Sequence, residues 1–375
     1  MWATIMIVSC AAALGWVVIL ALPWQPWRMG ESFEAHPADA RASLEDMTVL
    51  IPARDEAKTL GQVLDALAEQ GSNLSVIVAN DQSTDSTAQI ARNHSIAPRV
   101  IDVPSLPQGW TGKLWALEQA RRVATKQRLV LLDADIRLAP GTLAGLRAKA
   151  DANGLALASL MAHLRMYYTI EKLLIPAFIY FFKLLYPFAL SNAGSRFVKA
   201  SAGGCVLIDA NALDRIGGFS ALANAIIDDC TLASKVREDG GKTWVGVTHS
   251  ACSLRGYDSF QGISDMVARS AFTQLGYSTP LLIGATLAMV LLFIVPMAGL
   301  AIPKPVTRAV SSIGALAMMA SYLPTLAYYR RAPAWALLMP IIGCLYLGMT
   351  WLSAIRYWRG RRSAWRGRVY AREKT

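Results

Sequence analysis

Two aspartates separated by one residue, Asp133 and Asp135, are the strongest candidates for chemistry in this sequence. They follow the apolar run 128–132, which predicts a strand buried on both faces, as in a parallel sheet covered by helices. Ligands of such sheets bind beyond the carboxyl ends of the strands, and alternation directs both side chains into one crevice. Mg²⁺ or Mn²⁺ held by substrate phosphates would relieve the repulsion between the carboxylates. The alternative is that such an acid only caps the next helix.

Polar residues also follow the first two predicted strands. Pro52 stiffens the turn after the first strand, where Arg54 and Glu56 project. Asp81 follows the second strand, and an acid there can accept a hydrogen bond from a ribose hydroxyl or a base N–H. Asp85 lies in the run Ser-Thr-Asp-Ser-Thr, which is equally typical of a helix N-terminus. We therefore expect Asp81, more than Asp85, to contact a ligand.

A glycine-containing loop, residues 106–113, ends with Lys113 at the start of a predicted helix. A flexible loop that presents one lysine at a helix N-terminus suits a pyrophosphate group. The spacing differs from that of a Walker A loop. The alternative is a surface loop in which the lysine has no such role.

Two later segments could hold a general base and a phosphate ligand. The paired acids Asp228 and Asp229 begin a predicted helix, where they would complement the helix dipole. A carboxylate beside another carboxylate also has a raised pKa, which suits it to accept a proton. Arg269, in a helix predicted over 265–274, has the fork geometry that binds the oxygens of a leaving diphosphate.

The elements that must position these residues alternate between strand and helix. This pattern predicts an α/β fold with a doubly wound, mostly parallel sheet and right-handed crossovers. The dinucleotide fingerprint GxGxxG is absent after the first strand, so nucleotide recognition would depend on acids and loops. Strands are expected at 47–52, 74–80, 99–103, 128–132, 154–163 and after Gly203-Gly204, and helices at 57–70, up to 94 and at 113–124.

Four uncharged apolar runs are each close to the ~20 residues that cross a bilayer. They cover residues 2–22, 279–302, 309–329 and 335–355, and ionisable residues are essentially confined to their ends, which argues against a transporter or channel. We therefore expect an N-terminal membrane anchor (1–24), a linker (25–46), a catalytic-type domain (47–275), a C-terminal membrane region of about three apolar segments (279–355) and a basic tail (356–375).

Residues 170–190 interrupt the pattern of the middle domain because they are strongly apolar and aromatic. We interpret them as an interfacial segment lying in the plane of the membrane, near the point where a lipid would enter. The alternative is a core helix.

The chain of 375 residues has a net charge of +11, and the tail holds eight basic residues against one acid. A basic cluster after an apolar span is typical of the cytoplasmic side and of contact with anionic lipid, and we expect no nucleic acid as a partner. The five cysteines show no CxxC spacing, which predicts neither a disulfide framework nor a zinc site.

Taken together, these segments resemble the family 2 glycosyltransferases of the GT-A fold, and more narrowly the hopene-associated glycosyltransferases. The family landmarks occur in the family's order within residues 47–275. They are Pro52-Ala53-Arg54-Asp55-Glu56, Asp81-Gln82-Ser83, Gly109-Trp110-Thr111-Gly112-Lys113, Asp133-Ala134-Asp135, Gly203-Gly204 and Asp228-Asp229-Cys230-Thr231-Leu232. The runs Arg269-Ser270-Ala271-Phe272-Thr273-Gln274-Leu275 and Trp365-Arg366-Gly367-Arg368-Val369-Tyr370 are similar to those of the hopene-associated group.

The resemblance implies a role for each matching residue. Asp81 would bind the base or ribose, Asp135 would lie nearest the metal, and Asp229 would be the catalytic base. Asp228 replaces the family's usual Glu, and the Gln-x-x-Arg-Trp motif of processive members is absent. Substrate or nucleotide binding is expected of Pro52, Arg54, Glu56, Asp81, Ser83, Lys113, Asp133 and Arg269, catalysis of Asp229 and Asp228, and Mg²⁺ or Mn²⁺ binding of Asp135 and Asp133.

The expected activity is the metal-dependent transfer of one sugar from a nucleotide-diphosphate sugar to a lipid hydroxyl, with inversion at the anomeric carbon. We expect a UDP-linked donor. The resemblance suggests a hopanoid as the acceptor. The alternatives are a polyprenyl-phosphate sugar transferase and a non-catalytic nucleotide-sugar sensor. We expect a multi-pass protein of the bacterial inner membrane with its catalytic domain in the cytoplasm, because nucleotide sugars are found there. The lack of basic residues before the first span and the Arg-rich tail favour an N-terminus outside and a C-terminus in the cytoplasm, which needs an odd number of spans, whereas four runs are present.

Overall fold

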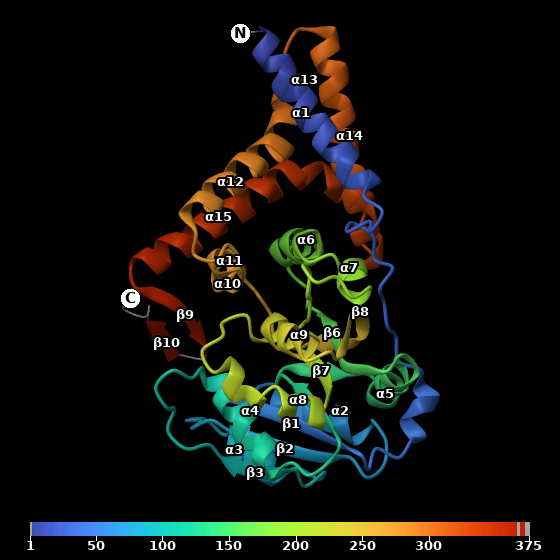
Figure 1. The fold of residues 1–375 in the computed structure, drawn as a ribbon, viewed down its shortest axis with the longest axis vertical. Coiled ribbons are helices and arrows are strands. Elements are labelled where there is room, and N and C mark those ends of the chain that lie inside the picture. The colour runs from blue at the N-terminus through green and yellow to red at the C-terminus, as the bar shows by residue number, and fades with distance from the viewer. Residues whose placement is uncertain (1, 366–367, 372–375) are drawn as a thin grey trace.

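The computed structural model of the chain describes residues 2–365 and 368–371, and the side chains of 361–365 and 369–371 are left out of the description. A domain built on one large sheet lies below a group of long helices (Figure 1). The strands are β1 (Met47–Ala53), β2 (Ser75–Asn80), β3 (Arg99–Asp102), β4 (Arg128–Leu132), β5 (Ile136–Leu138), β6 (Leu155–His163), β7 (Cys205–Asp209), β8 (Lys242–Ser253), β9 (Arg361–Trp365) and β10 (Arg368–Ala371).

The helices alternate with the first strands and then dominate the C-terminal part. Those of the domain are η1 (Pro37–Arg41), α2 (Leu60–Ala68), α3 (Thr87–Arg92), α4 (Gly112–Val123), α5 (Thr142–Asn153), α6 (Thr169–Leu185), α7 (Phe188–Asn192), α8 (Ala210–Arg215), η2 (Gly218–Leu222), α9 (Asp228–Glu238), α10 (Phe260–Ala268) and α11 (Ala271–Gln274). The remaining helices are α1 (Trp2–Ala21), α12 (Thr279–Met289), η3 (Val290–Ile294), α13 (Val295–Leu300), α14 (Pro305–Tyr328), η4 (Pro333–Leu338) and α15 (Met339–Trp358).

The eight-stranded sheet has the order β3-β2-β1-β4-β7-β6-β8-β5. Strands β1 to β4 are mutually parallel, β7 runs antiparallel to both β4 and β6, and β8 is parallel to β6. The prediction of an α/β, mostly parallel sheet is therefore confirmed, together with the predicted strands. Strands β5 and β8 are not among those predicted.

Helices cover both faces of the sheet because its central strands are apolar on both sides. All seven residues of β1 are buried. Val49 packs in the same cluster as Val63 of α2, whereas its neighbour Leu50 packs with Leu114 of α4 on the opposite face. Burial of each such side chain contributes roughly 1.5–3 kcal/mol. Packing on both faces holds the central strands in place and so positions their carboxyl ends, where the candidate residues lie.

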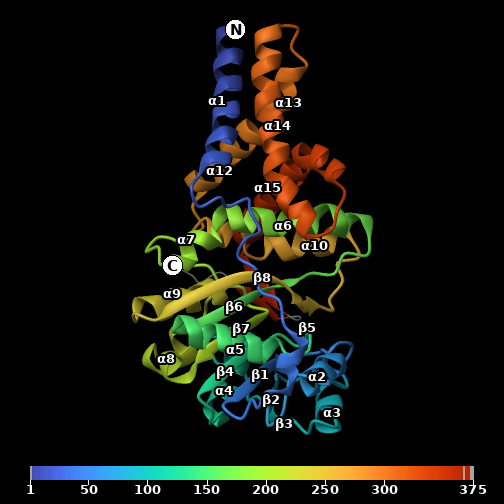
Figure 2. The ribbon, with the colours of Figure 1, turned by 90° about the vertical axis from the view of Figure 1, so that its right-hand side faces the viewer.

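Within the described residues, four helical segments are long and apolar enough to cross a membrane: Trp2–Ala21, Thr279–Leu300, Pro305–Tyr328 and Pro333–Trp358. They coincide with the four predicted runs. Helices α1 and α14 lie side by side, and α12 and α15 run obliquely above the domain (Figures 1 and 2).

The segment Thr279–Leu300 contains a π-helical turn, η3, and the cause is Pro296. Proline has no N–H with which to bond the carbonyl four residues earlier, that of Leu292. The indole N–H of Trp16 on α1 donates to the Leu292 carbonyl instead, at 2.6 Å. A neighbouring helix thus satisfies the carbonyl that the proline leaves without its helical partner, as apolar surroundings require.

The apolar segment 170–190 forms α6 and α7, and α6 lies between the sheet and the helices α14 and α15 (Figure 2). Its buried face includes Leu174, Ile179 and Lys183. The Lys183 ammonium is neutralised by Glu31 at 2.5 Å, a residue of the predicted linker. The buried face fits the core-helix alternative, and contact of the rest of α6 with lipid stays a prediction.

The predicted linker is packed against the domain. Phe33 donates its N–H to the Val247 carbonyl and Val247 donates to that of Glu31, so the linker runs along β8. After α15, strands β9 and β10 form an antiparallel hairpin beside the catalytic domain (Figure 1). The expected contact of the basic tail with lipid stays a prediction.

Candidate active site

A cavity of about 270 Å³ opens at the carboxyl ends of the central strands. Five ionisable residues that the sequence predicted meet in its polar part. They are Lys113, Asp133, Asp135, Asp228 and Asp229. They come from the start of α4, the end of β4 and the start of α9, segments that are far apart in the sequence. The sheet topology therefore unites the predicted metal, phosphate and base residues in one place.

Lys113 lies among the acids of this cluster. Its ammonium nitrogen is 2.8 Å from Asp133 Oδ1 and 3.5 Å from Asp228 Oδ2. Burial alone would lower the pKa of Lys113, but the carboxylates of Asp133 and Asp228 outweigh burial and raise it. Lys113 is consequently a permanent cation, as phosphate binding requires. The pKa of Asp133 is raised by burial and by Asp135, against the opposing effect of Lys113.

Asp229 has the properties of a general base. Burial first and the neighbouring Asp228 second raise the pKa of Asp229 to about 6. Its Oδ1 accepts a hydrogen bond from the Cys230 N–H at 2.7 Å at the beginning of α9. A carboxylate with this pKa is ionised at neutral pH and still basic enough to take a proton. The prediction that paired acids would raise the pKa of one member is thus supported by the geometry.

Gly203 provides the space for this arrangement. A Cβ atom at this position would lie 3.3 Å from the Lys113 ammonium and 3.5 Å from Asp229 Oδ2. The contact with the ammonium is tight, so a side chain at position 203 would require Lys113 to shift by a few tenths of an ångström. Gly203 therefore leaves room for the Lys113 and Asp229 side chains.

Asp135 is held by a second cation, Arg255, from the loop after β8. Asp135 Oδ2 lies 3.3 Å from Arg255 Nε and accepts a hydrogen bond from Ser253 Oγ at 3.0 Å. Arg255 also contacts Glu56 Oε1 at 3.3 Å, which links the predicted residue Glu56 to the cluster. Arg255 and Ser253 were missed in the sequence. The signal that could have found them is the polar run that ends the long strand β8.

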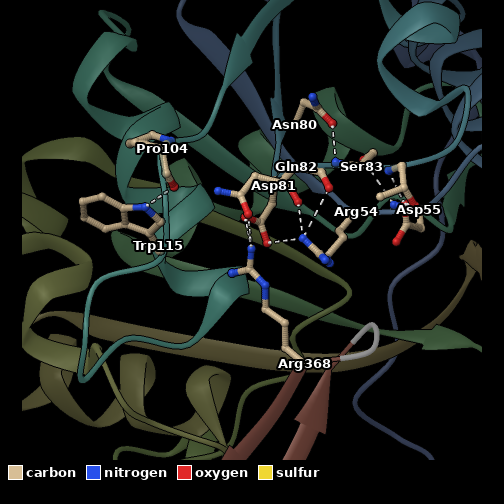
Figure 3. A network of polar contacts seen from close by, with 10 residues as sticks. Arg54, Asp55, Asn80, Asp81, Gln82, Ser83, Pro104, Trp115 and Arg368 are labelled. Carbon is tan, nitrogen blue, oxygen red and sulfur yellow. Dashed lines mark hydrogen bonds and ion pairs between the residues drawn. The ribbon is translucent and has the colours of Figure 1, made fainter.

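Three of the predicted nucleotide-binding residues, Arg54, Asp81 and Ser83, lie at the ends of β1 and β2 (Figure 3). Asp81 is fully buried, and Arg54 Nη1 donates to its carbonyl oxygen at 2.7 Å and lies 3.9 Å from Oδ2. Ser83 accepts a hydrogen bond from the Asp55 N–H at 3.2 Å and so ties the two loops together. Asp55 and Gln82 both adopt positive φ, of 52° and 54°, which marks these loop ends as strained.

Asp85 has a structural role. Its carboxylate accepts hydrogen bonds from the N–H groups of Thr87 and Ala57, at 2.9 and 3.1 Å. These bonds join the start of α3 to the loop after β1 and lower the pKa of Asp85 against the effect of burial. The alternative of a helix N-terminus is therefore the one that the structure supports for Asp85.

The other part of the cavity is apolar. Its wall consists of Met161, Leu164, Phe178, Phe182 and Met266. Phe178 and Phe182 belong to α6 and Met266 to α10, and both helices pack against α15. The cavity therefore connects a charged cluster with a wall made by the helices nearest to the apolar spans. Pro52 and Arg269, two further predicted residues, also line it.

The carboxylates of the cavity can hold a divalent cation only if a bound substrate supplies further oxygen ligands. The described residues include no group of three or more His, Cys, Asp or Glu side chains that could hold a metal. Asp133 and Asp135 each use one oxygen, Oδ1 and Oδ2 respectively, for the cations described above. Mg²⁺ commonly takes only one or two carboxylates and completes its shell with phosphate oxygens and water. The pair thus suits a metal that arrives with a phosphate-bearing substrate.

Comparisons with known proteins agree with this geometry. Residues 48–217 match the family Glycosyl transferase family 2. The chain is 39% identical over 93 residues to a 4,4'-diaponeurosporenoate glycosyltransferase of Staphylococcus aureus strain bovine RF122 / ET3-1. It is 40% identical over 91 residues to the protein of that name in strain USA300. Both matches span 24% of this chain and 24% of the relative, so the chain matches about a quarter of the length of these proteins.

A solved structure resembles nearly the whole chain. It is the mannosyltransferase PcManGT from Pyrobaculum calidifontis in complex with GDP-Man and Mn²⁺, with a TM-score of 0.55 and 18% identity. The superposition covers 95% of this chain and 99% of that chain, which shows a shared fold. With the sheet order and the acid cluster at the strand ends, the conclusion is that the chain has a GT-A-like fold in which residues 48–217 match Glycosyl transferase family 2.

Proposed function

We propose that this protein is a membrane-bound glycosyltransferase that moves one sugar from a nucleoside-diphosphate sugar to a hydroxyl group of a lipid, with inversion at the anomeric carbon. The observation that carries the proposal is the single cavity in which Asp229 and Lys113 face a wall of Phe178, Phe182 and Met266. A sugar donor requires the charged part of such a cavity, and a lipid acceptor requires the apolar part. The relatives named for 4,4'-diaponeurosporenoate, the anion of a long apolar acid, support an apolar acceptor, and the hydroxyl is a finer part of the proposal.

Different residues of the cavity act on the acceptor and on the leaving diphosphate. Asp229 accepts the proton of the acceptor hydroxyl, whose oxygen attacks the anomeric carbon on the face opposite the diphosphate. Lys113, with Arg269 at the rim, stabilises the negative charge that develops on the leaving diphosphate. Asp133 and Asp135 would hold Mg²⁺ or Mn²⁺, which supplies further charge stabilisation to the diphosphate when it is bound.

The proposal places the acceptor between α6 and α10. The apolar helices attach the protein to the inner membrane in this proposal, and an odd number of crossings keeps both the catalytic domain and the hairpin after α15 on the cytoplasmic side, where donors are available. The interfacial position predicted for residues 170–190 then brings Phe178 and Phe182 close to the lipid phase. UDP as the donor nucleotide and a hopanoid as the acceptor are the finer parts of the proposal.

The direct test is transfer by purified, detergent-solubilised protein. A panel of UDP-, GDP- and other nucleotide sugars is supplied with Mn²⁺ or Mg²⁺, with and without lipid extract from a hopanoid-producing cell. We expect lipid-dependent release of nucleoside diphosphate from one donor, and mass spectrometry identifies the glycosylated lipid. Binding of donors without turnover on any lipid would favour the sensor alternative and contradict the proposal.

A polyprenyl-phosphate acceptor is the second candidate, and the observation in its favour is that Arg255 and Arg269 both line the cavity and could bind an acceptor phosphate. A phosphate acceptor is already ionised and needs little help from a base. An Asp229→Asn variant should therefore lose nearly all transfer to a hydroxyl but keep much of its transfer to a phosphate. Synthetic alcohol and phosphate acceptors of the same chain length make this comparison direct.

A further inference from the structure

The hairpin of β9 and β10, which follows the last apolar helix, brings one side chain to the nucleotide end of the site. Arg368, the first residue of β10, lies 287 positions after Asp81 in the sequence. Its Nη2 donates to Asp81 Oδ1 at 2.9 Å and to Gln82 Oε1 at 3.1 Å (Figure 3). The segment after the membrane region thus contacts the end of β2, where the sequence predicts recognition of the base or ribose.

The contact leaves two buried polar atoms unsatisfied. Asp81 Oδ2 and Arg368 Nη1 are both inaccessible to solvent, and neither has a hydrogen-bond partner. Arg54 Nη1 lies 3.9 Å from Asp81 Oδ2, too far for a hydrogen bond. Buried polar groups are nearly always hydrogen-bonded, and each one left without a partner is costly. The unpaired acceptor, Asp81 Oδ2, and the unpaired donor, Arg368 Nη1, therefore indicate a ligand that offers one hydrogen-bond donor and one acceptor.

We propose that Arg368 is a nucleotide-binding residue of the donor site: Asp81 Oδ2 accepts a hydrogen bond from an N–H of the base, and Arg368 Nη1 donates to an acceptor atom of the same nucleotide. This inference rests on the proposed function, because it assumes a nucleoside-diphosphate donor. It adds that the donor site of the catalytic domain is incomplete without the C-terminal hairpin. Adjacent N–H and acceptor atoms are present on the pairing edges of nucleobases, so the ligand class is a nucleoside diphosphate.

The local charges agree with this role. Asp81 has no exposed surface, and Arg368 is only 15% exposed. An ion pair this deeply buried gains little over apolar residues unless its remaining donors and acceptors are satisfied. A simple latch between the hairpin and the domain would not need an unpaired guanidinium nitrogen beside an unpaired carboxylate oxygen. A nucleotide edge would satisfy both atoms, and the hairpin would have to shift outward to admit it, because neither atom is accessible to solvent.

The opposite interpretation is that Arg368 occupies the place of the base and must leave before the donor binds. The two interpretations predict changes of opposite sign. Removal of a nucleotide-binding arginine weakens nucleotide binding, whereas removal of a plug strengthens it. The affinity of the Arg368→Ala variant therefore decides between them.

The experiment is isothermal titration calorimetry of the full, detergent-solubilised chain with UDP, GDP, ADP and CDP. For the nucleotide that binds best, we expect Arg368→Ala to raise Kd roughly 10- to 100-fold, the factor associated with one charge-assisted hydrogen bond. Arg368→Lys keeps the charge but not the fork, and should give an intermediate Kd. The matched control is Arg215→Ala, which removes an exposed arginine paired with Asp239 and should leave Kd unchanged.

A second arm asks whether Arg368 acts through the Asp81 site. In an Asp81→Asn background, the Arg368→Ala change should have a clearly smaller effect on Kd, because the two residues serve one ligand edge. Equal effects in both backgrounds, an unchanged Kd, or tighter binding by Arg368→Ala would overturn the inference. Thermal unfolding and recovery by Arg368→Lys separate a binding defect from misfolding.

The failure of this inference is distinguishable from the failure of the proposed function. Nucleotide binding that is weakened by Arg368→Ala, with no sugar transfer by the wild-type chain, would contradict the transferase proposal and leave the role of Arg368 intact. Sugar transfer by the wild-type chain, with unaltered nucleotide affinity in Arg368→Ala, would do the reverse.

Discussion

The rate of transfer should depend on pH through Asp229, and the structure gives both the midpoint and the direction. Burial and the adjacent Asp228 raise the pKa of Asp229 from 3.8 to about 6. Only the ionised form can accept the proton of the acceptor. About nine tenths of the sites are then ionised at pH 7 and about one tenth at pH 5, so kcat/KM should fall about tenfold between these values.

The Asp228→Asn variant tests the cause of this behaviour. Removal of the neighbouring negative charge should lower the pKa of Asp229, so the acid limb of the profile should move to lower pH, toward the ordinary value of 3.8. Asp229→Asn should reduce kcat by roughly 10²–10⁴-fold at every pH, the usual contribution of general base catalysis. Calorimetric affinity for the donor nucleotide should change little in Asp229→Asn, since Asp229 acts on the acceptor.

The assay measures initial rates of lipid-dependent nucleotide release between pH 4.5 and 8, at saturating and at limiting donor. A flat profile between pH 5 and 7 would refute the assignment of Asp229 as the base. An acid limb that stays in place or moves to higher pH in Asp228→Asn would refute the electrostatic explanation. The Arg215→Ala variant, which changes an exposed charge paired with Asp239, controls for nonspecific effects of charge on the profile.

Three further predictions follow from the same cavity. Gly203→Ala should lower kcat by about tenfold or more with little loss of folding, because its Cβ would press on the Lys113 ammonium at 3.3 Å; circular dichroism and rates measured together check this. Phe182→Ser should raise KM for the lipid acceptor and leave nucleotide Kd unchanged, whereas Phe197→Ala, an 81% exposed site, should alter neither; equal effects on both substrates would contradict the assignment of the apolar wall. Removal of divalent metal with EDTA should abolish transfer, and Asp135→Asn should increase the Mn²⁺ concentration for half-maximal rate by roughly 10-fold or more; an activity that is indifferent to EDTA would contradict a metal at this pair.

The raised pKa of Asp229 also has a cost in stability, which follows from linkage. A carboxyl group with a raised folded-state pKa opposes folding wherever it is ionised, fully above about pH 6 and not at all below the unfolded value of 3.8. Function is the reason to retain such a group, since a neutral residue would fit the fold better. The site thus follows the common pattern in which active-site groups are held against their solution preference.

Much of the architecture is determined locally. The apolar run 128–132, for example, must form a strand buried on both faces, and the chain places Asp133 and Asp135 directly after it. The four long apolar helices are likewise determined by composition over about 20 residues, which needs no tertiary information. The strand ends, and hence Asp81, Asp133 and the acids that begin α9, could therefore be predicted from sequence as candidates.

Contacts between distant segments were decided only by the tertiary structure. Arg255 meets Asp135 because β8 joins the sheet through β6 and pairs with β5, an order that no local pattern specifies. Asp85 could be a ligand or part of a helix N-terminus by sequence, and only the folded chain brings the Ala57 N–H to its second carboxylate oxygen. Arg368 belongs by sequence to a basic tail, yet the hairpin after α15 carries it to a buried aspartate 287 positions earlier. Side-chain type and periodicity are properties of short stretches of chain. The pairing of charged residues depends on the tertiary fold, because it brings together segments that are far apart in the sequence.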